Sequence, residues 1–189
     1  MLLRLGLPVL LAGAWCMTWN PVSPLAMGRA NAAYLAGDLP RAARIYGQIA
    51  TGWHLSSTRA SAGERAARIA LVGGEPVIAV REIHRALAVC TAADRPRLLG
   101  LLASVYLVYF DDAPRAAAAL RRAADSGVGP AALDDRVAAA QTFERAEDWA
   151  SAGEQWALIL VAAETVDIEA MARAGQLRAE RHIDDAEGE

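Results

Sequence analysis

The chain has 189 residues, a net charge of −3 and a pI of about 5.7. All 19 basic residues are arginines and they form no basic stripe, which argues against a nucleic-acid-binding protein. Two cysteines far apart, Cys16 and Cys90, exclude a disulfide framework and a cysteine metal pair. The length and the lack of an interior linker favour one domain.

Residues 1–21 contain an uncharged apolar run, Leu5 to Trp19, which follows Arg4. The run is typical of a signal peptide with Ala12-Gly13-Ala14 as its cleavage site. It could also be a membrane anchor, although it is shorter than the roughly 20 apolar residues that span a bilayer. Arg4 on its amino-terminal side predicts a chain that is anchored facing the periplasm, or exported. An extra apolar helix packed on the first repeat is the alternative.

The remainder of the chain is expected to be helical. Apolar residues at i, i+4 and i+7 form stripes with the helical period, and signals such as Ser23-Pro24 and Gly129-Pro130 mark helix starts. The predicted helices are 23–36, 39–52, 57–73, 76–90, 95–110, 113–126, 130–146, 149–163 and 166–182.

One segment recurs four times along these helices. Its first copy has a small residue at Ala30, an acid at Asp38, then Ala42 and Tyr46 at further intervals of four. Steps of 37, 37 and 36 residues reach the other copies. They place small residues at Ala67, Ser104 and Ala140, acids at Glu75, Asp112 and Asp148, alanines at Ala79, Ala116 and Ala152, and bulky residues at Ile83, Leu120 and Trp156. Such a period predicts stacked helical hairpins.

Physical chemistry explains the conserved spacing within each copy. A carboxylate at the start of the second helix can accept hydrogen bonds from the unpaired N–H groups of the first turn. Small residues on the first helix face the alanine of the second helix, so the two backbones can approach closely. One hairpin cannot cover its own apolar side, and stacking on its neighbours buries it.

The first copy, Asn31…Tyr34-Leu35-Ala36-Gly37-Asp38-Leu39…Ala42…Tyr46, resembles the tetratricopeptide repeat (TPR), with its small helix contacts and Gly-Asp turn. The later copies depart from the family pattern, because Asp111 and Glu147 stand where the turn glycine is expected. The period also exceeds the family's usual 34 residues. The resemblance implies an all-α fold, a right-handed α-solenoid of about four TPR-like hairpins with a carboxyl-terminal capping helix.

The ninth predicted helix carries charged residues together with the apolar Met171 and Leu177, as the cap of a solenoid requires. The predicted domain organisation therefore has four parts. They are a signal peptide or anchor at 1–21; four repeats over 22–163, at about 22–54, 57–91, 95–127 and 130–163; the capping helix at 164–183; and a disordered acidic tail at 184–189.

No group of residues resembles a catalytic site. The three histidines, His54, His84 and His182, do not share metal-ligand spacing, and no glycine-rich phosphate loop occurs. The acid pairs Asp111-Asp112 and Asp134-Asp135 fall at predicted helix starts. We therefore expect no enzymatic activity, no metal and no cofactor.

In TPR arrays the first helix of each repeat lines a groove, and the resemblance implies a partner-binding groove here. Its apolar third copy would form a centre for a helix or apolar peptide segment of a partner protein. The alternative is that neighbouring helices cover these residues. The family's Lys/Asn/Arg clamp for acidic carboxyl termini is absent, since only Asn31 matches it. The predicted groove residues are Met27, Asn31, Tyr34, Arg68, Leu71, Leu101, Val105, Val108, Gln141 and Glu144.

The sequence thus predicts a non-catalytic TPR adaptor or scaffold for protein–protein interaction at the bacterial membrane or in the periplasm. A structural subunit of an envelope complex is the alternative. Asn20-Pro21 ahead of Gly28…Gly37-Asp38 also resembles the opening of the TPR proteins of bacterial aerotolerance clusters, which are encoded with von Willebrand-type and MoxR-type ATPases. That resemblance implies an accessory role in such a system.

Overall fold

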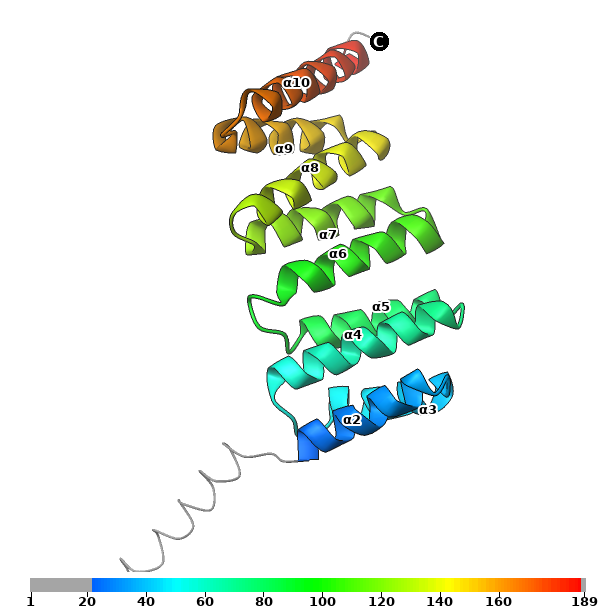
Figure 1. Cartoon of the computed structure of the whole chain (residues 1–189). Helices are drawn as coiled ribbons and strands as arrows, with labels where there is room; N and C mark the ends of the chain where they lie inside the picture. Colours follow the sequence, from blue (N-terminus) through cyan, green and yellow to red (C-terminus); the bar gives the residue numbers. More distant parts are fainter. Residues whose placement is uncertain (1–21, 188–189) are drawn as a thin grey trace, which may run out of the picture.

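The computed structural model describes residues 22–187 and shows a column of stacked antiparallel helices (Figure 1). The predicted signal or anchor at 1–21 lies outside the described residues. Within the described part every regular element is helical. The elements are α2 (Val22–Leu35), α3 (Leu39–Thr51), α4 (Ser56–Val72), α5 (Pro76–Leu87), α6 (Arg95–Val105), the π-helical turn η1 (Tyr106–Phe110), α7 (Ala113–Ser126), α8 (Pro130–Arg145), α9 (Trp149–Ala162) and α10 (Val166–Glu187).

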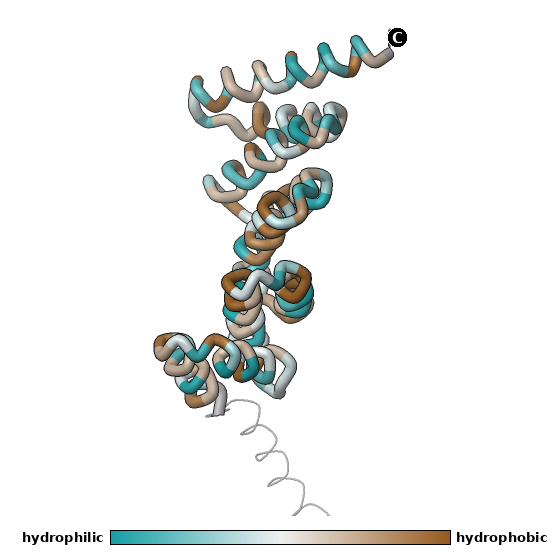
Figure 2. The backbone as a smooth tube through the Cα atoms, turned by 90° about the vertical axis from the view of Figure 1, so that its right-hand side faces the viewer, coloured by the Kyte–Doolittle hydropathy of each residue, from teal (hydrophilic) through white to brown (hydrophobic). Residues whose placement is uncertain are grey.

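Apolar and polar residues are interspersed along the helices (Figure 2), and many of the side chains buried between the helices are small alanines. The buried small residues lie where the repeat places them. Ala30, Ala67 and Ala140 are fully buried, as are the four alanines that face the first helices: Ala42, Ala79, Ala116 and Ala152. Small side chains therefore meet inside every hairpin, which lets the paired helices approach closely.

The third copy differs from the prediction at its small residue. Ser104 is exposed, whereas its neighbour Ala103 is fully buried in the core. Asp112 nevertheless starts α7 as expected. The first helix of this copy thus contains one residue more between its buried alanine and its acid than the other copies do.

The π-helical turn η1 accommodates this extra residue. In copies one, two and four, the N–H of the acid donates to the carbonyl five residues earlier, as from Asp148 to Phe143 at 3.0 Å. In copy three the N–H of Asp112 donates to Tyr106, six residues earlier, at 3.0 Å. A π turn widens the helix by one residue without ending it. The predicted single α-helix over 95–110 is therefore an α-helix followed by a π turn.

Three of the four predicted carboxylate caps form in the structure. The side chains of Asp38, Asp112 and Asp148 each accept a hydrogen bond from the backbone N–H three residues later, at 3.0–3.1 Å. Glu75 begins α5 without a side-chain cap. Glutamate has one more methylene than aspartate and is not among the residues that favour this position.

The turn residues just before these acids adopt left-handed backbone angles. The φ angles are 77° at Gly37 and 73° at Gly74, and they are 48° at Asp111 and 59° at Glu147. The two acids that replace the family's turn glycine therefore hold a conformation that costs non-glycine residues about 1–2 kcal/mol. The tight turn between the paired helices is kept in all four copies.

The last helix, α10, packs on α9 and ends the column (Figure 1). Ala172 and Ala179 are buried on its inner side. The structure continues α10 to Glu187, so residues 184–187, expected to be disordered, are helical. No proline interrupts the sequence after Val166, and no glycine follows Gly175 until Gly188, so nothing breaks the helix earlier.

Candidate partner-binding site

The predicted groove residues of the first two repeats lie on α2 and α4. Tyr34 and Arg68 are exposed, whereas Met27, Asn31 and Leu71 are half-buried. Met27 packs against the core of the first repeat and Leu71 against that of the second. On this part of the column, polar and aromatic side chains remain accessible to a partner.

The predicted apolar centre in the third repeat is wrong. Val105 is 0% exposed and belongs to the hydrophobic core, together with Leu102 and Ala103. Leu101 is half-buried against the same core, whereas Val108 is exposed within η1. The prediction took Ser104 as the inward-facing small residue. Because Ala103 occupies that place, every side-chain assignment on α6 shifts by one position, and the groove-facing residue is Ser104.

A hollow of about 310 Å³ opens instead between the first three repeats. Its walls come from α2, α3, α4 and the first turn of α6. Three guanidinium groups and one carboxylate line it, so the charge around it is positive. The lining residues are Tyr34, Tyr46, Ser61, Glu64, Arg65, Arg68 and Arg97.

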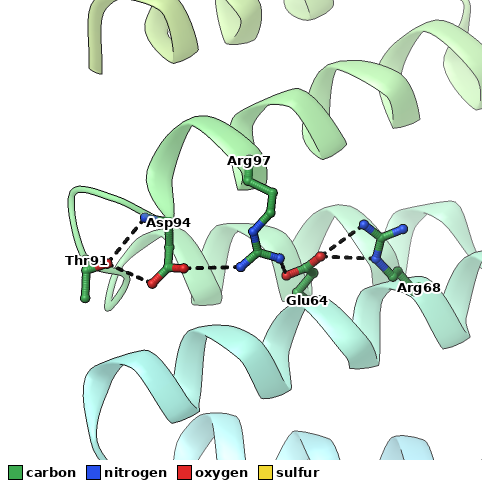
Figure 3. A network of polar contacts seen from close by, with 5 residues as sticks. All are labelled: Glu64, Arg68, Thr91, Asp94 and Arg97. Carbon is green, nitrogen blue, oxygen red and sulfur yellow. Dashed lines mark hydrogen bonds and ion pairs between the residues drawn. The ribbon is translucent and has the colours of Figure 1, made fainter. Parts of the chain in front are cut away.

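Glu64 is the centre of the ionic network in this hollow (Figure 3). It is only 7% exposed. Its Oε1 accepts hydrogen bonds from Nε and Nη2 of Arg68, at 3.2 and 3.0 Å, and its Oε2 accepts one from Arg97. Arg97 lies on α6, so the contact joins the second repeat to the third. The buried carboxylate thereby fixes two guanidinium groups whose side chains remain about half exposed.

Arg97 is held in place from its other side as well (Figure 3). Its Nη2 donates to Oδ1 of Asp94 at 3.3 Å, and Oδ2 of Asp94 accepts from the hydroxyl of Thr91 at 2.7 Å. This chain of contacts runs from the α5–α6 loop to α4. Such a network limits the rotamers of Arg97 before any partner binds.

Tyr46 and Arg65, which also line the hollow, form a cluster with Asn31. The hydroxyl of Tyr46 donates to Oδ1 of Asn31 at 2.5 Å, and Nη1 of Arg65 donates to the same oxygen at 2.9 Å. The guanidinium carbon of Arg65 also lies 5.9 Å from the centroid of the Tyr46 ring. Asn31, predicted as a binding residue, therefore orients an arginine of the next repeat.

Of the predicted groove residues, Tyr34 and Arg68 line this hollow and Asn31 binds its Arg65, but the prediction missed Arg65 and Arg97. Arg97 is separated from Glu64 by 33 residues, so no local pattern links them. A signal was present at Glu64, because it occupies the repeat position of Met27 and a charge there requires a partner. Two arginines follow it within one helical turn.

The predicted groove residues of the fourth repeat have different roles. Gln141 is exposed, on α8. Oε1 of Glu144 accepts from the indole Nε1 of Trp156 at 2.8 Å and from Nη2 of Arg178 at 2.9 Å. Glu144 therefore joins α8 to α9 and α10. For Glu144, the structure therefore agrees with the alternative expectation that neighbouring helices cover the groove residues.

Within residues 22–187, no three His, Cys, Asp or Glu side chains come together in a way that could hold a metal ion. No helix in this part of the chain is both long and apolar enough to cross a bilayer. The absence of enzymatic activity stays a prediction.

No protein-family model and no curated protein matches the chain. Solved structures do. The chain is similar to the nearly identical TPR-like repeats assigned to a kinesin light chain of Podosopora anserina, with 14% identity, a TM-score of 0.54, and coverage of 87% of this chain and 88% of that one. A variant of the same repeats gives 14% identity, a TM-score of 0.56 and coverage of 90% and 91%.

The chain has a TPR-like fold. At 14% identity these structures show the fold alone, and they confirm the predicted all-helical, TPR-like solenoid. The arginine hollow, which is lined by Arg65, Arg68 and Arg97, lies between the first three repeats, where side chains from successive repeats converge.

Proposed function

We propose that the protein is a non-catalytic TPR-like adaptor that binds a partner protein through the hollow lined by Arg65, Arg68 and Arg97. The observation that carries this proposal is the convergence of three guanidinium groups on one hollow, in which the buried carboxylate of Glu64 holds Arg68 and Arg97. Glu64 and Asp94 together neutralise two of the three positive charges, which leaves a net positive site. The neighbouring Tyr34 adds an exposed aromatic ring at its edge.

A partner segment with carboxylate groups suits this site best. Guanidinium groups bind carboxylates with two parallel hydrogen bonds, and these charge-assisted bonds are stronger than neutral ones. Arg68 and Arg97 are oriented by Glu64, so little side-chain entropy is lost on binding. This acidic segment replaces the apolar segment expected from the sequence, because Val105 is buried in the core.

The test is a binding titration with labelled peptides that differ only in charge: an Asp/Glu-rich peptide, its Asn/Gln counterpart and a Lys-rich peptide. We expect the acidic peptide to bind best, and Arg68→Ala to weaken it about ten- to hundredfold, since one charge-assisted hydrogen bond contributes about 1.5–3 kcal/mol. Arg44→Ala removes the same charge from the exposed side of α3, outside the hollow, and should change the affinity by less than about twofold. Equal effects of both variants would refute the site.

We further propose that residues 1–21 anchor the adaptor in a bacterial membrane, facing the periplasm, or direct its export. The apolar run Leu5 to Trp19 behind Arg4 supports this. Cell fractionation of the full chain tests the location, and mass spectrometry of the mature amino terminus distinguishes cleavage after Ala14 from a retained anchor. Recovery of the intact chain wholly in the cytosol would contradict the proposal.

The roles as a structural envelope subunit and as an accessory protein of an aerotolerance system stay predictions. An envelope subunit would use the surface formed by α3, α5 and α7 instead of the arginine hollow. Partner capture that survives Arg68→Ala but fails after substitutions on α5 would favour that role.

A further inference from the structure

The last turn of α10 has an unfavourable charge for the end of a helix. It contains the acids Asp184, Asp185 and Glu187 and no basic residue. The carboxyl end of a helix carries a partial negative charge, so acids there are repelled and basic groups are favoured. A cationic surface placed against this acidic turn would therefore stabilise it.

The acidic turn also projects from the end of the column. The ring of His182 stacks on that of Trp149, the first residue of α9, with the ring centroids 3.8 Å apart. The residues after His182 therefore extend past the beginning of α9. Asp184 and Asp185 are exposed, and in the described part of the chain neither forms an ion pair, even with Arg181 one turn earlier. Their carboxylates remain available to another molecule.

The arginine hollow contains one guanidinium group that has no carboxylate partner. Two of its three arginines bind Glu64, whereas Nη1 of Arg65 donates to neutral groups, to Oδ1 of Asn31 at 2.9 Å and to the hydroxyl of Tyr46 at 3.4 Å. Among the residues that the structure describes, none forms an ion pair with Arg65, which is exposed. The positive charge that the hollow retains is therefore centred on Arg65.

Opposite charge favours this hollow over the others as the site for the acidic turn. Three other hollows on the described part of the column are lined by more acidic than basic side chains, so they would repel it. The arginine hollow, of about 310 Å³, has room for side chains but not for a whole helix. The carboxylates of the turn can enter it while the end of α10 stays outside.

The acidic turn and the arginine hollow cannot meet within one chain. The hollow is formed by α2, α3, α4 and the first turn of α6, whereas α10 lies at the far end of the column (Figure 1). The helices α7, α8 and α9 are stacked between them. The acidic turn of one copy can therefore reach only the hollow of another copy.

We propose that the protein self-associates head to tail, with the acidic last turn of α10 of one copy bound in the arginine hollow of the next. This inference rests on the proposed function, because it identifies an acidic segment that the hollow binds. Carboxylates of the turn accept charge-assisted hydrogen bonds from Arg65, and the end of α10 gains a cation. The contact joins two different surfaces and is therefore heterologous, so it can add further copies. An acidic segment of a partner protein competes for the same hollow.

Sedimentation of the full chain over a wide range of concentrations tests this proposal. We expect reversible association that weakens at least tenfold between about 0.02 M and about 0.5 M salt, because salt screens exposed ion pairs. A chain that is monomeric at all concentrations in low salt, or an association that salt leaves unchanged, would overturn the proposal.

The double variant Asp184→Asn/Asp185→Asn tests the acidic turn. It should weaken the association at least tenfold with an unchanged melting curve, because both side chains are exposed. The matched control is Glu164→Gln/Asp167→Asn, which removes two exposed acids at the opposite end of α10 and gives the same net charge. The control should associate like the parent. Equal weakening by the two double variants would overturn the proposal.

Complementation tests both surfaces at once. Arg65→Ala retains the acidic turn, and Asn31 and Tyr46 still bind each other in it. Asp184→Asn/Asp185→Asn retains the hollow. At a concentration where neither variant associates alone, their mixture should give a one-to-one complex and nothing larger, because only one pair of working surfaces remains. Failure of the mixture to associate would overturn the head-to-tail contact.

A peptide titration separates this inference from the proposed function. The Asp/Glu-rich peptide should bind to Asp184→Asn/Asp185→Asn, whose hollow is intact, and it should dissociate the assemblies of the parent chain, whereas its Asn/Gln counterpart should not. Peptide binding together with a monomeric parent would refute the self-association and leave the proposed function standing. No binding of the acidic peptide to this variant would refute the proposed function itself.

Discussion

Gly175 of α10 lies directly against the indole ring of Trp156 of α9. A Cβ built on Gly175 would be 2.4 Å from ring atoms Cδ2 and Cε2 of Trp156, which is inside any real contact distance. Trp156 is fully buried, and its Nε1 donates to Glu144 on α8, which also binds Arg178 on α10. One aromatic side chain therefore connects the last three helices, and a glycine on α10 makes room for it.

Gly175→Ala should destabilise the protein by at least about 1–3 kcal/mol, because the indole cannot move away without breaking its hydrogen bond to Glu144. Thermal unfolding followed by circular dichroism measures the change. The matched control is Gly153→Ala, also between α9 and α10, where the new Cβ would lie at an ordinary 3.5 Å from Ala179. The control should be neutral or stabilising by about 0.5–1 kcal/mol, since alanine favours helix more than glycine does. Equal behaviour of the two variants would refute this packing.

The repeat itself could be predicted from the sequence for a physical reason. The buried alanines, the capping acids and the helix stripes are local features, and each repeats at a fixed distance along the chain. Ala42, Ala79, Ala116 and Ala152 are all fully buried as a result. The same local signals also located most helix starts.

The inserted residue in the third copy could not be predicted in the same way. A π turn inserts one residue without ending the helix, and its position cannot be read from the sequence, because Ser104 and Ala103 are both small and either fits the pattern of a small residue before the acid. Only packing against α7 shows that Ala103 faces inward. The contact of Glu64 with Arg97 could not be predicted from the sequence either, because it depends on how two repeats stack.

Because the register of α6 is shifted by one residue, a charge should have opposite effects on stability at Val105 and at Val108. Val105→Glu should destabilise the protein by more than about 4 kcal/mol or prevent folding, because the new charge would lie unpaired in the core. Val108 is 74% exposed, and Val108→Glu should change stability by less than about 0.5 kcal/mol. Urea unfolding of both variants measures the difference. If Val105→Glu folds as stably as Val108→Glu, the groove assignment made from the sequence is correct and the π turn is wrong.

The capping acids should differ in their effect on stability. Asp112→Ala and Asp148→Ala each remove a side chain that accepts from a first-turn N–H, and each should cost about 0.5–2 kcal/mol in chemical unfolding. Glu75 makes no such bond, so Glu75→Ala should cost less than about 0.5 kcal/mol. A loss at Glu75 as large as that at Asp112 would show that the acids stabilise their helices mainly through the helix dipole.

The small residues inside the hairpins should not tolerate growth. Ala116 is fully buried where α7 meets α6, and Ala116→Leu should cost about 1–3 kcal/mol by forcing the two helices apart. Neighbouring repeats should loosen as well, because each repeat is stabilised by the next. Hydrogen exchange of α5 and α8 measures this spread. Melting of Ala116→Leu at the parent temperature would contradict the close approach of the helices.

Asp135 on α8 should make the stability of the protein depend on pH. Burial, and secondarily the neighbouring charge of Asp134, raises the pKa of Asp135 above its ordinary value of 3.8. The folded state therefore binds the proton more tightly than the unfolded state, so this residue lowers stability as pH rises through the raised pKa. Asp135→Asn removes the charge and should be more stable than the parent at neutral pH, with the difference vanishing below the ordinary pKa. Urea midpoints across this pH range measure the effect. Asp134→Asn, at an exposed neighbour, should give a smaller gain, because it relieves only the secondary cause; a larger gain there would show that charge repulsion outweighs burial.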